Sequence, residues 1–304
     1  MDFLKKNSCQ LIIGVGGGSP MDVTKAVSVM AGNEGSLLDY VGINQIPNKG
    51  LPHILIPTTS GTGSEVTQNA IFTDKKEKLK KGIVSEYFLP KVAIIDSDLT
   101  LTVPPRVTAA TGMDALTHAI ESYTSPKATL QTDLYALEAI RLIGRSLRRA
   151  VSFGADEKAR EDMAIASYFA GVSLANAGVG SVHALAYPLG GQFGVSHGVS
   201  NALLLPYVME FNIIGHIEKF THVAEALGEN VCGLSQREAA FKGLKAVQEL
   251  SADVGIPQKL REVGVNKEDL EGLAKATMNV TRLLGNNPRI MNYDDVYSIF
   301  NKAF

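Results

Sequence analysis

The sequence contains only two cysteines, Cys9 and Cys232, and they lie far apart. A disulfide framework or a cysteine-based zinc site is therefore not expected, and a reducing compartment suits such a chain. No apolar run approaches the roughly 20 residues that a membrane-spanning helix needs. The first residues also lack the pattern of a secretory signal. We therefore expect a cytoplasmic protein without a membrane partner.

Neither positive nor negative charge predominates in the sequence. The chain has 29 Lys and Arg against 31 Asp and Glu, with no basic tract. This balance argues against a nucleic-acid partner or a membrane-surface partner. We find no internal repeat and no low-complexity segment. The 304 residues are enough for two domains, each with a buried core.

Three short apolar runs mark the first third of the chain: Leu11–Val15, His53–Ile56 and Val92–Ile95. Continuous runs of this kind are typical of parallel strands that are buried on both faces. Val66–Phe72 alternates between apolar and polar residues and predicts a further strand. The charged residues 75–81 predict a solvated turn. This part of the chain is therefore expected to be α/β.

The first apolar run leads into the glycine loop Gly14–Ser19, and Met21–Met30 predicts a helix with Pro20 near its first turn. Strand, glycine loop and helix together present backbone N–H groups and a positive helix end to a phosphate. The pattern is not G-x-G-x-x-G, because Ser19 stands in the last glycine position. A tight turn without a ligand fits a triple glycine nearly as well.

The second apolar run leads into Pro57–Glu65, where threonine and serine alternate with glycine. Hydroxyl groups in such a loop suit the oxygens of ribose and phosphate. A solvated loop is the alternative interpretation. Because open α/β sheets bind ligands at the carboxyl ends of their strands, the position of this threonine loop favours a nucleotide site.

After Val103 the strand signals end and helical periodicity begins. Ser235 and Glu238 form a capping box for a helix that is predicted to end at Asp253, and Tyr293–Ala303 is predicted to be an amphipathic helix. A further helix has an apolar stripe at helical spacing, formed by Leu134, Leu137, Ile140, Ile143 and Leu147. We therefore predict an α/β nucleotide-binding domain at 1–103 and an all-α metal-binding domain at 104–304.

Four residues of the second domain are candidate metal ligands. Asp114 and His118 are four residues apart on a predicted helix and so project from one face. His183 and His197 stand on either side of a helix break predicted at 188–191, which would bring the second imidazole back to the first. One carboxylate and three imidazoles suit Fe²⁺ or Zn²⁺. Either pair alone also fits a surface pair or a core histidine, so the prediction depends on all four.

The chain resembles the iron-containing (group III, metal-dependent) alcohol dehydrogenase family. The resemblance rests on residues 16–25, 57–65, 96–100, 112–121, 183–201 and 287–289, which follow the family's order through the chain. It implies a Rossmann-like N-terminal domain and an all-α C-terminal domain, the dehydroquinate synthase-like architecture. It also implies that the active site lies between these domains and that the protein forms a homodimer or a higher homo-oligomer.

The resemblance also implies individual roles. The four metal positions of the family fall on Asp114, His118, His183 and His197. Its positions for NAD or NADP fall on Gly17, Gly18, Ser19, Asp22, Thr58, Thr59, Thr62, Asn69 and Lys80. In some members a histidine lies four residues after the first histidine of the long motif. Here that position is Tyr187, which puts a histidine proton relay in doubt.

The resemblance differs most at the start of the chain. Family members carry a further βα segment ahead of the first strand, and it contributes to the adenosine pocket. Without it, we expect the N-terminal domain to be incomplete and Leu11–Val15 to lie at an exposed apolar edge. We also expect self-association through that edge or poor solubility, and weaker dinucleotide binding.

The function implied is an NAD(P)-dependent alcohol dehydrogenase that interconverts a primary or small alcohol with its aldehyde. One alternative is a metal-dependent lyase or cyclase of the dehydroquinate synthase type, which shares the glycine loop. The segments Thr58–Glu65 and His183–Pro188 favour the dehydrogenases. A second alternative is a catalytically impaired fragment that only binds metal.

Overall fold

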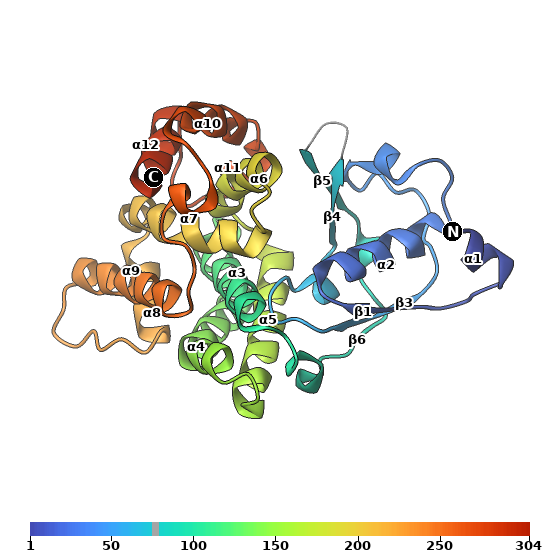
Figure 1. Cartoon of the computed structure of the whole chain (residues 1–304), viewed down its shortest axis with the longest axis horizontal. Coiled ribbons are helices and arrows are strands. Elements are labelled where there is room, and N and C mark those ends of the chain that lie inside the picture. The colour runs from blue at the N-terminus through green and yellow to red at the C-terminus, as the bar shows by residue number, and fades with distance from the viewer. Residues whose placement is uncertain (75–78) are drawn as a thin grey trace.

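The computed structural model of the chain describes residues 1–74 and 79–304, apart from the side chains of residues 5, 73, 74, 79 and 80. Figure 1 shows two parts side by side, one built on short strands and the other on long helices. The N-terminus lies at the far end of the α/β part, and the C-terminus lies in the helical part. The predicted fold class, a Rossmann-like α/β region followed by an all-α region, is confirmed.

The first sheet is parallel and has the strand order β1 (Ile12–Gly16), β3 (His53–Pro57) and β6 (Val92–Ala93). In the register of β1 and β3, Gly16 lies opposite Pro57. Both strands therefore end at the same edge of the sheet. The glycine loop and the threonine loop leave the sheet next to each other, as a nucleotide site requires.

The second sheet has the order β2 (Gly42–Ile43), β5 (Leu79–Val84) and β4 (Asn69–Asp74). β4 and β5 are antiparallel, whereas β2 and β5 are parallel. A short helix, α1 (Asp2–Lys6), precedes β1. Short 3₁₀ turns in this part cover Leu37–Tyr40, Ser64–Val66, Glu86–Phe88 and Ser97–Thr100.

Helix α2 (Gly18–Met30) follows the glycine loop and contacts both sheets. Its Lys25 is completely buried, and the Nζ donates hydrogen bonds to the carbonyl oxygens of Thr67 (3.0 Å) and Asn69 (2.7 Å). Burial lowers the pKa of Lys25 to about 8, and the charges of Asp22 and Glu65 offset part of this effect. Lys25 thus fastens α2 to the start of β4.

The helical part contains ten described helices. They are α3 (Pro105–Thr124), α4 (Leu130–Ser152), α5 (Glu157–Ala177), α6 (Ser181–Phe193), α7 (His197–Asn212), α8 (Ile217–Ala226), α9 (Gln236–Asp253), α10 (Leu270–Met278), α11 (Thr281–Leu284) and α12 (Tyr293–Ala303). 3₁₀ turns cover Ile213–Gly215, Leu260–Val263 and Lys267–Asp269. α3 lies against α4, α5 and α7, and the main hydrophobic core of the protein surrounds it.

The two parts meet where the threonine loop contacts α5. Gly63 has φ +59°, and a Cβ there would lie 2.5 Å from the Cα of Gly171. Only glycine allows both this backbone conformation and this close approach. Arg160 of α5 adds hydrogen bonds to the carbonyl oxygen of Val103 (3.0 Å) and the hydroxyl of Thr108 (2.8 Å). The domain boundary at Val103 stays a prediction, and the observed helical part begins at Pro105.

Several predicted elements are shifted in the structure. The third apolar run forms strand only over Val92–Ala93, because only those residues pair with β3. The strand predicted at Val66–Phe72 begins at Asn69, after a 3₁₀ turn. The solvated turn predicted at 75–81 is not tested at 75–78, which lie outside the described residues, and β5 begins at Leu79.

The helix break predicted at 188–191 is wrong. α6 continues through Pro188 and the two glycines to Phe193, and the chain turns at Gly194, which has φ +68°. The first turns of α6 are buried against α7 and α10. This packing outweighs the low helix propensity of proline and glycine. The turn therefore lies three residues after the end of its sequence signal.

β1 is the outermost strand of its sheet, and its side chains are not buried on both faces. Ile13 is 56% exposed and Val15 is 54% exposed. The prediction of two buried faces is wrong for these residues, whereas the exposed apolar edge is confirmed. Self-association through that edge stays a prediction.

Among the described helices, none is by itself long and apolar enough to cross a membrane. α5 and α6 pass that test only as a pair bent by 104°, on length and composition alone.

Candidate metal centre and cofactor cavity

α3 supplies the first two candidate ligands from its buried face. Asp114 and His118 lie one helical turn apart and are 2% and 4% exposed. The Nε2 of His118 is 3.9 Å from the Oδ1 of Asp114. Burial alone would raise the pKa of Asp114, but the neighbouring His118, His197 and His183 lower it below its usual value. Asp114 is therefore an ionised carboxylate in a buried site.

The other two candidate ligands lie at the starts of two consecutive helices. His183 is in the first turn of α6, and His197 is the first residue of α7. The ring of His183 stacks on His118 with centroids 4.9 Å apart, and its centroid is 5.2 Å from that of His197. One ligand atom from each of the four residues lies within 4.8 Å of the others. The structure thus brings the four predicted residues to one point.

Hydrogen bonds orient two of the imidazoles. The Nδ1 of His118 lies 3.2 Å from the carbonyl oxygen of Gly61, and the Nδ1 of His183 lies 2.5 Å from Glu121 Oε2. Glu121 Oε1 also accepts a hydrogen bond from the backbone N–H of Val182 at 2.7 Å. Since both acceptors require an Nδ1–H, the Nε2 lone pairs are left for a metal. Burial lowers the pKa of His118, which keeps that imidazole neutral.

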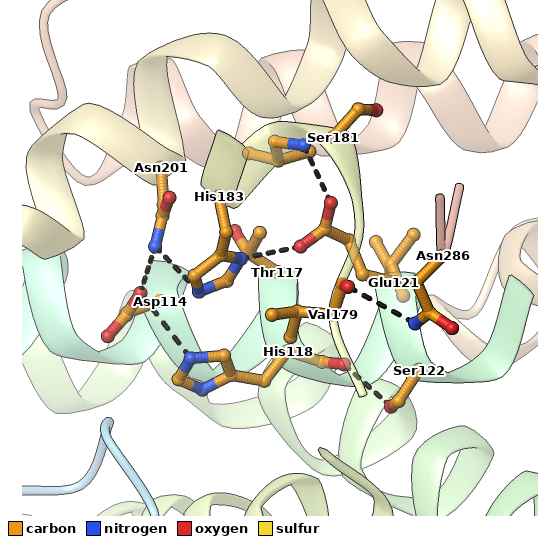
Figure 2. Close-up of polar contacts among 12 residues, drawn as sticks. Asp114, Thr117, His118, Glu121, Ser122, Val179, Ser181, His183, Asn201 and Asn286 are labelled. Carbon is orange, nitrogen blue, oxygen red and sulfur yellow. Dashed lines mark hydrogen bonds and ion pairs between the residues drawn. The ribbon is translucent and has the colours of Figure 1, made fainter. Parts of the chain in front are cut away.

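Asn201 provides a test of whether this group suits a cation. Figure 2 shows its amide directed at Asp114 and His183. The amide nitrogen lies 2.7 Å from Asp114 Oδ1, 3.0 Å from His183 Nε2 and 3.2 Å from His197 Nε2. Three acceptors thus share the two protons of one amide, so acceptor capacity is in surplus. A group of one carboxylate and three imidazoles, in which all but His197 are buried, fits a divalent Fe or Zn ion. Within the described structure, Asn201 Oδ1 has no hydrogen-bond partner.

The metal group opens into a cavity of about 420 Å³. Gly18 and Ser19 at the start of α2 line the same cavity, together with Asp22, Thr62 and Asn69. The N-terminus of a 13-residue helix therefore faces the space next to the ligands. A helix start with a free backbone carries a partial positive charge and suits a phosphate.

Gly17, Thr58 and Thr59 do not line this cavity. Gly17 packs against Thr59, and a Cβ there would lie 3.2 Å from its hydroxyl. Thr58 donates its backbone N–H to the carbonyl oxygen of Gly16 at 2.9 Å. Thr59 itself lines a separate void of about 10 Å³, which is too small for a nucleotide. The side chain of Lys80 lies outside what the structure describes.

Asp22 lines the cavity but is already engaged by the protein. Its carboxylate accepts hydrogen bonds from Ser64 Oγ at 2.8 Å and from the N–H of Ile71 at 3.0 Å. Burial raises the pKa of Asp22, and the charge of Lys25 counteracts this. Asp22 therefore joins the three segments that form this wall of the cavity.

The sequence interpretation missed four residues of this region: Glu121, Asn201, Lys127 and Arg282. Helical spacing held a signal for the first two, because Glu121 lies three residues after His118 and Asn201 lies four residues after His197. No such signal marked Lys127 or Arg282. Lys127 lines the cavity from the connection between α3 and α4, and Arg282 lines it from the four-residue helix α11.

Known proteins are similar to this chain in sequence and fold. The family model "Iron-containing alcohol dehydrogenase" matches residues 1–97, and "Fe-containing alcohol dehydrogenase family, C-terminal" matches residues 108–304. The chain is 48% identical to long-chain-alcohol dehydrogenase 1 of Geobacillus thermodenitrificans, over 99% of this chain and 77% of that protein. It is 46% identical to 1,3-propanediol dehydrogenase of Citrobacter freundii, over 100% of this chain and 78% of that protein.

A solved structure agrees with these similarities. The crystal structure of a 1,3-propanediol oxidoreductase superposes with a TM-score of 0.97 at 45% sequence identity, covering 100% of this chain and 79% of that chain. The family models together cover nearly the whole chain. The chain belongs to the iron-containing alcohol dehydrogenase family.

Proposed function

We propose that the protein catalyses reversible hydride transfer between a primary or small alcohol and NAD(P) in the cavity described above. One observation carries this proposal. A group of four metal-binding side chains and the N-terminus of α2 line the same cavity of about 420 Å³. A site for the substrate oxygen and a site for a dinucleotide phosphate therefore belong to one space, as hydride transfer requires.

Asp114, His118, His183 and His197 would hold the metal, Fe²⁺ or Zn²⁺. Such an ion supplies Lewis-acid chemistry, which stabilises negative charge on the oxygen of an alcohol or aldehyde. Glu121 and the carbonyl of Gly61 fix the tautomers of His183 and His118. Asn201 holds the carboxylate of Asp114 in place through its amide.

The cofactor would lie along the start of α2. The backbone at Gly18 and Ser19 would bind the pyrophosphate, and the remaining positions from the family pattern would contact the rest of the dinucleotide. These positions are Gly17, Asp22, Thr58, Thr59, Thr62, Asn69 and Lys80. Gly17, Thr58 and Thr59 would act mainly by holding the glycine and threonine loops together, since their described contacts join these loops.

The names of the relatives support a small alcohol or aldehyde as substrate. They include a 1,3-propanediol dehydrogenase, an NAD-dependent methanol dehydrogenase and a lactaldehyde reductase. We also propose, from the family resemblance, that the protein is a homo-oligomer. A cytoplasmic location is part of the proposal and rests on the two distant free cysteines.

The test combines elemental analysis with an assay of NAD(P)H formation from propanol and 1,3-propanediol. His197→Ala should lose the metal and turnover together, because one of four ligands is removed. The matched control is His216→Ala, a histidine of the α7–α8 connection that does not line the cavity. Full metal content in His197→Ala would exclude His197 as a ligand. A fully metal-loaded wild type that turns over neither alcohol with either dinucleotide would contradict the proposed activity.

A further inference from the structure

The wall of the cavity on the helical side combines apolar side chains with the basic side chains of Lys127 and Arg282. Leu174, Val179 and Tyr187 line the cavity there. Leu174 and Val179 belong to a small buried cluster, against which Tyr187 packs. α11, which carries Arg282, contacts α6, which carries Tyr187. This wall adjoins the metal group and is separate from α2.

The acidic side chains that line the cavity are hydrogen-bonded to other protein groups, whereas the basic ones are not bonded to any described residue. Both acidic side chains, Asp22 and Asp114, are engaged by hydrogen bonds from the protein. The two basic side chains, Lys127 and Arg282, also line the cavity and are exposed. No group of the described residues forms a hydrogen bond or an ion pair with either of these two side chains. The cavity therefore has two positive charges that no described residue pairs.

Arg282 is the better placed of the two to bind a substrate. Leu283, the residue after Arg282, is buried in the cluster against which Tyr187 packs, so Arg282 and Tyr187 line the same wall. The phenol is a hydrogen-bond donor on the same wall as the guanidinium. A guanidinium presents paired N–H groups that match the two oxygens of a carboxylate. An uncharged alkyl chain would make no use of this pair.

We propose that Arg282 and Tyr187 form a subsite for an anionic group, a carboxylate or a similar oxyanion, at the end of the substrate remote from the reacting carbon. The inference rests on the proposed function and specifies its substrate class. The substrate would be a short aldehyde or alcohol with its oxygen at the metal group, its chain along Leu174 and Val179, and its anion at Arg282. Lys127 would contribute positive potential without a direct contact.

The test compares two four-carbon aldehydes, succinic semialdehyde and butanal, in the metal-loaded enzyme with NADH. Wild type should favour the anionic aldehyde in kcat/KM by about tenfold, in line with one charged hydrogen-bonded pair at an exposed site. Arg282→Gln should lose that preference, because its kcat/KM should fall much further for succinic semialdehyde than for butanal. Tyr187→Phe should lose a smaller part of it. Arg237→Gln on α9 is the matched control, since it removes the same charge from a surface outside the cavity.

A binding measurement accompanies the kinetics. Succinate should raise the Tm of the wild-type protein more than that of Arg282→Gln. Equal kcat/KM for the two aldehydes in wild type would overturn the subsite while leaving the dehydrogenase activity intact. Activity on neither aldehyde would instead contradict the proposed function. If Arg282→Gln raised the KM for NADH equally with both aldehydes, Arg282 would serve the cofactor and the proposal would be wrong.

Discussion

Glu121 offers a sharp test of how the metal site is built. The change is Glu121→Gln, which keeps the size of the side chain and removes its charge. In the native site both carboxylate oxygens accept hydrogen bonds, one from His183 Nδ1 at 2.5 Å and one from the N–H of Val182 at 2.7 Å. A glutamine has only one acceptor oxygen, so one of these donors must face the amide NH₂ group.

Both orientations of the new amide disturb the site. If the NH₂ faces His183, the imidazole must carry its proton on Nε2, and that nitrogen can no longer bind a metal. If the NH₂ faces Val182, two donors meet in a buried site, because Glu121 is only 6% exposed. An unsatisfied buried donor costs about 1–3 kcal/mol. Loss of a carboxylate that orients a metal-binding histidine typically lowers metal affinity by about 10–100-fold.

The assay is competition for the metal with a chelator of known affinity, together with the Tm of the metal-free protein. Glu121→Gln should bind the metal about 10–100-fold more weakly than wild type. Glu138→Gln on α4 is the control, because Glu138 forms an exposed ion pair with Arg141 outside the cavity. Wild-type metal affinity in Glu121→Gln would refute the role given to this carboxylate.

Three further predictions concern the α/β part. Gly18→Val should weaken dinucleotide binding and spare metal binding, since even a Cβ there would lie 2.9 Å from Thr62; equal nucleotide affinity by calorimetry would place the phosphate elsewhere. Lys25→Met should lower the free energy of unfolding by about 1–3 kcal/mol, because it leaves buried carbonyl oxygens unpaired. The native pKa of Lys25, about 8, is below its usual 10.5, so the unfolded chain binds more protons between these values. Stability should therefore rise with pH in that window in wild type but not in Lys25→Met, as urea unfolding at several pH values would show. Ile13→Lys at the exposed edge of β1 should reduce self-association in analytical ultracentrifugation, and an unchanged oligomer would exclude that edge.

Local signals were sufficient to predict much of the fold. The run at 11–15 predicted β1, and the capping box at Ser235 and Glu238 was found as predicted. Tyr293–Ala303 matched its helix at both ends. Both helices begin with a capping box whose two residues are three positions apart. Burial of a whole face was harder to predict: Leu134 belongs to the predicted apolar stripe of α4 but is 63% exposed.

The candidate site shows where local patterns stop being informative. Asp114 and His118 could be paired from their spacing alone, because one helix fixes their relative position. The spacing of His183 and His197 could not fix their geometry, since the turn between them lies at Gly194 and was predicted at 188–191. The four residues still meet, because His183 and His197 each lie in the first turn of their own helix and α6 packs against α7.

The same reasoning explains why no sequence pattern indicated that Lys127 and Arg282 line the cavity. Arg282 lies in a four-residue helix near the end of the chain, about a hundred residues after Tyr187. It reaches the cavity because α11 contacts α6, a contact between segments with no common motif. That Arg282 has no partner among the described residues can be known only once its neighbours are placed in the structure. Metal ligands can therefore be proposed from residue types and spacing, whereas the residues that choose the substrate depend on how separate helices pack.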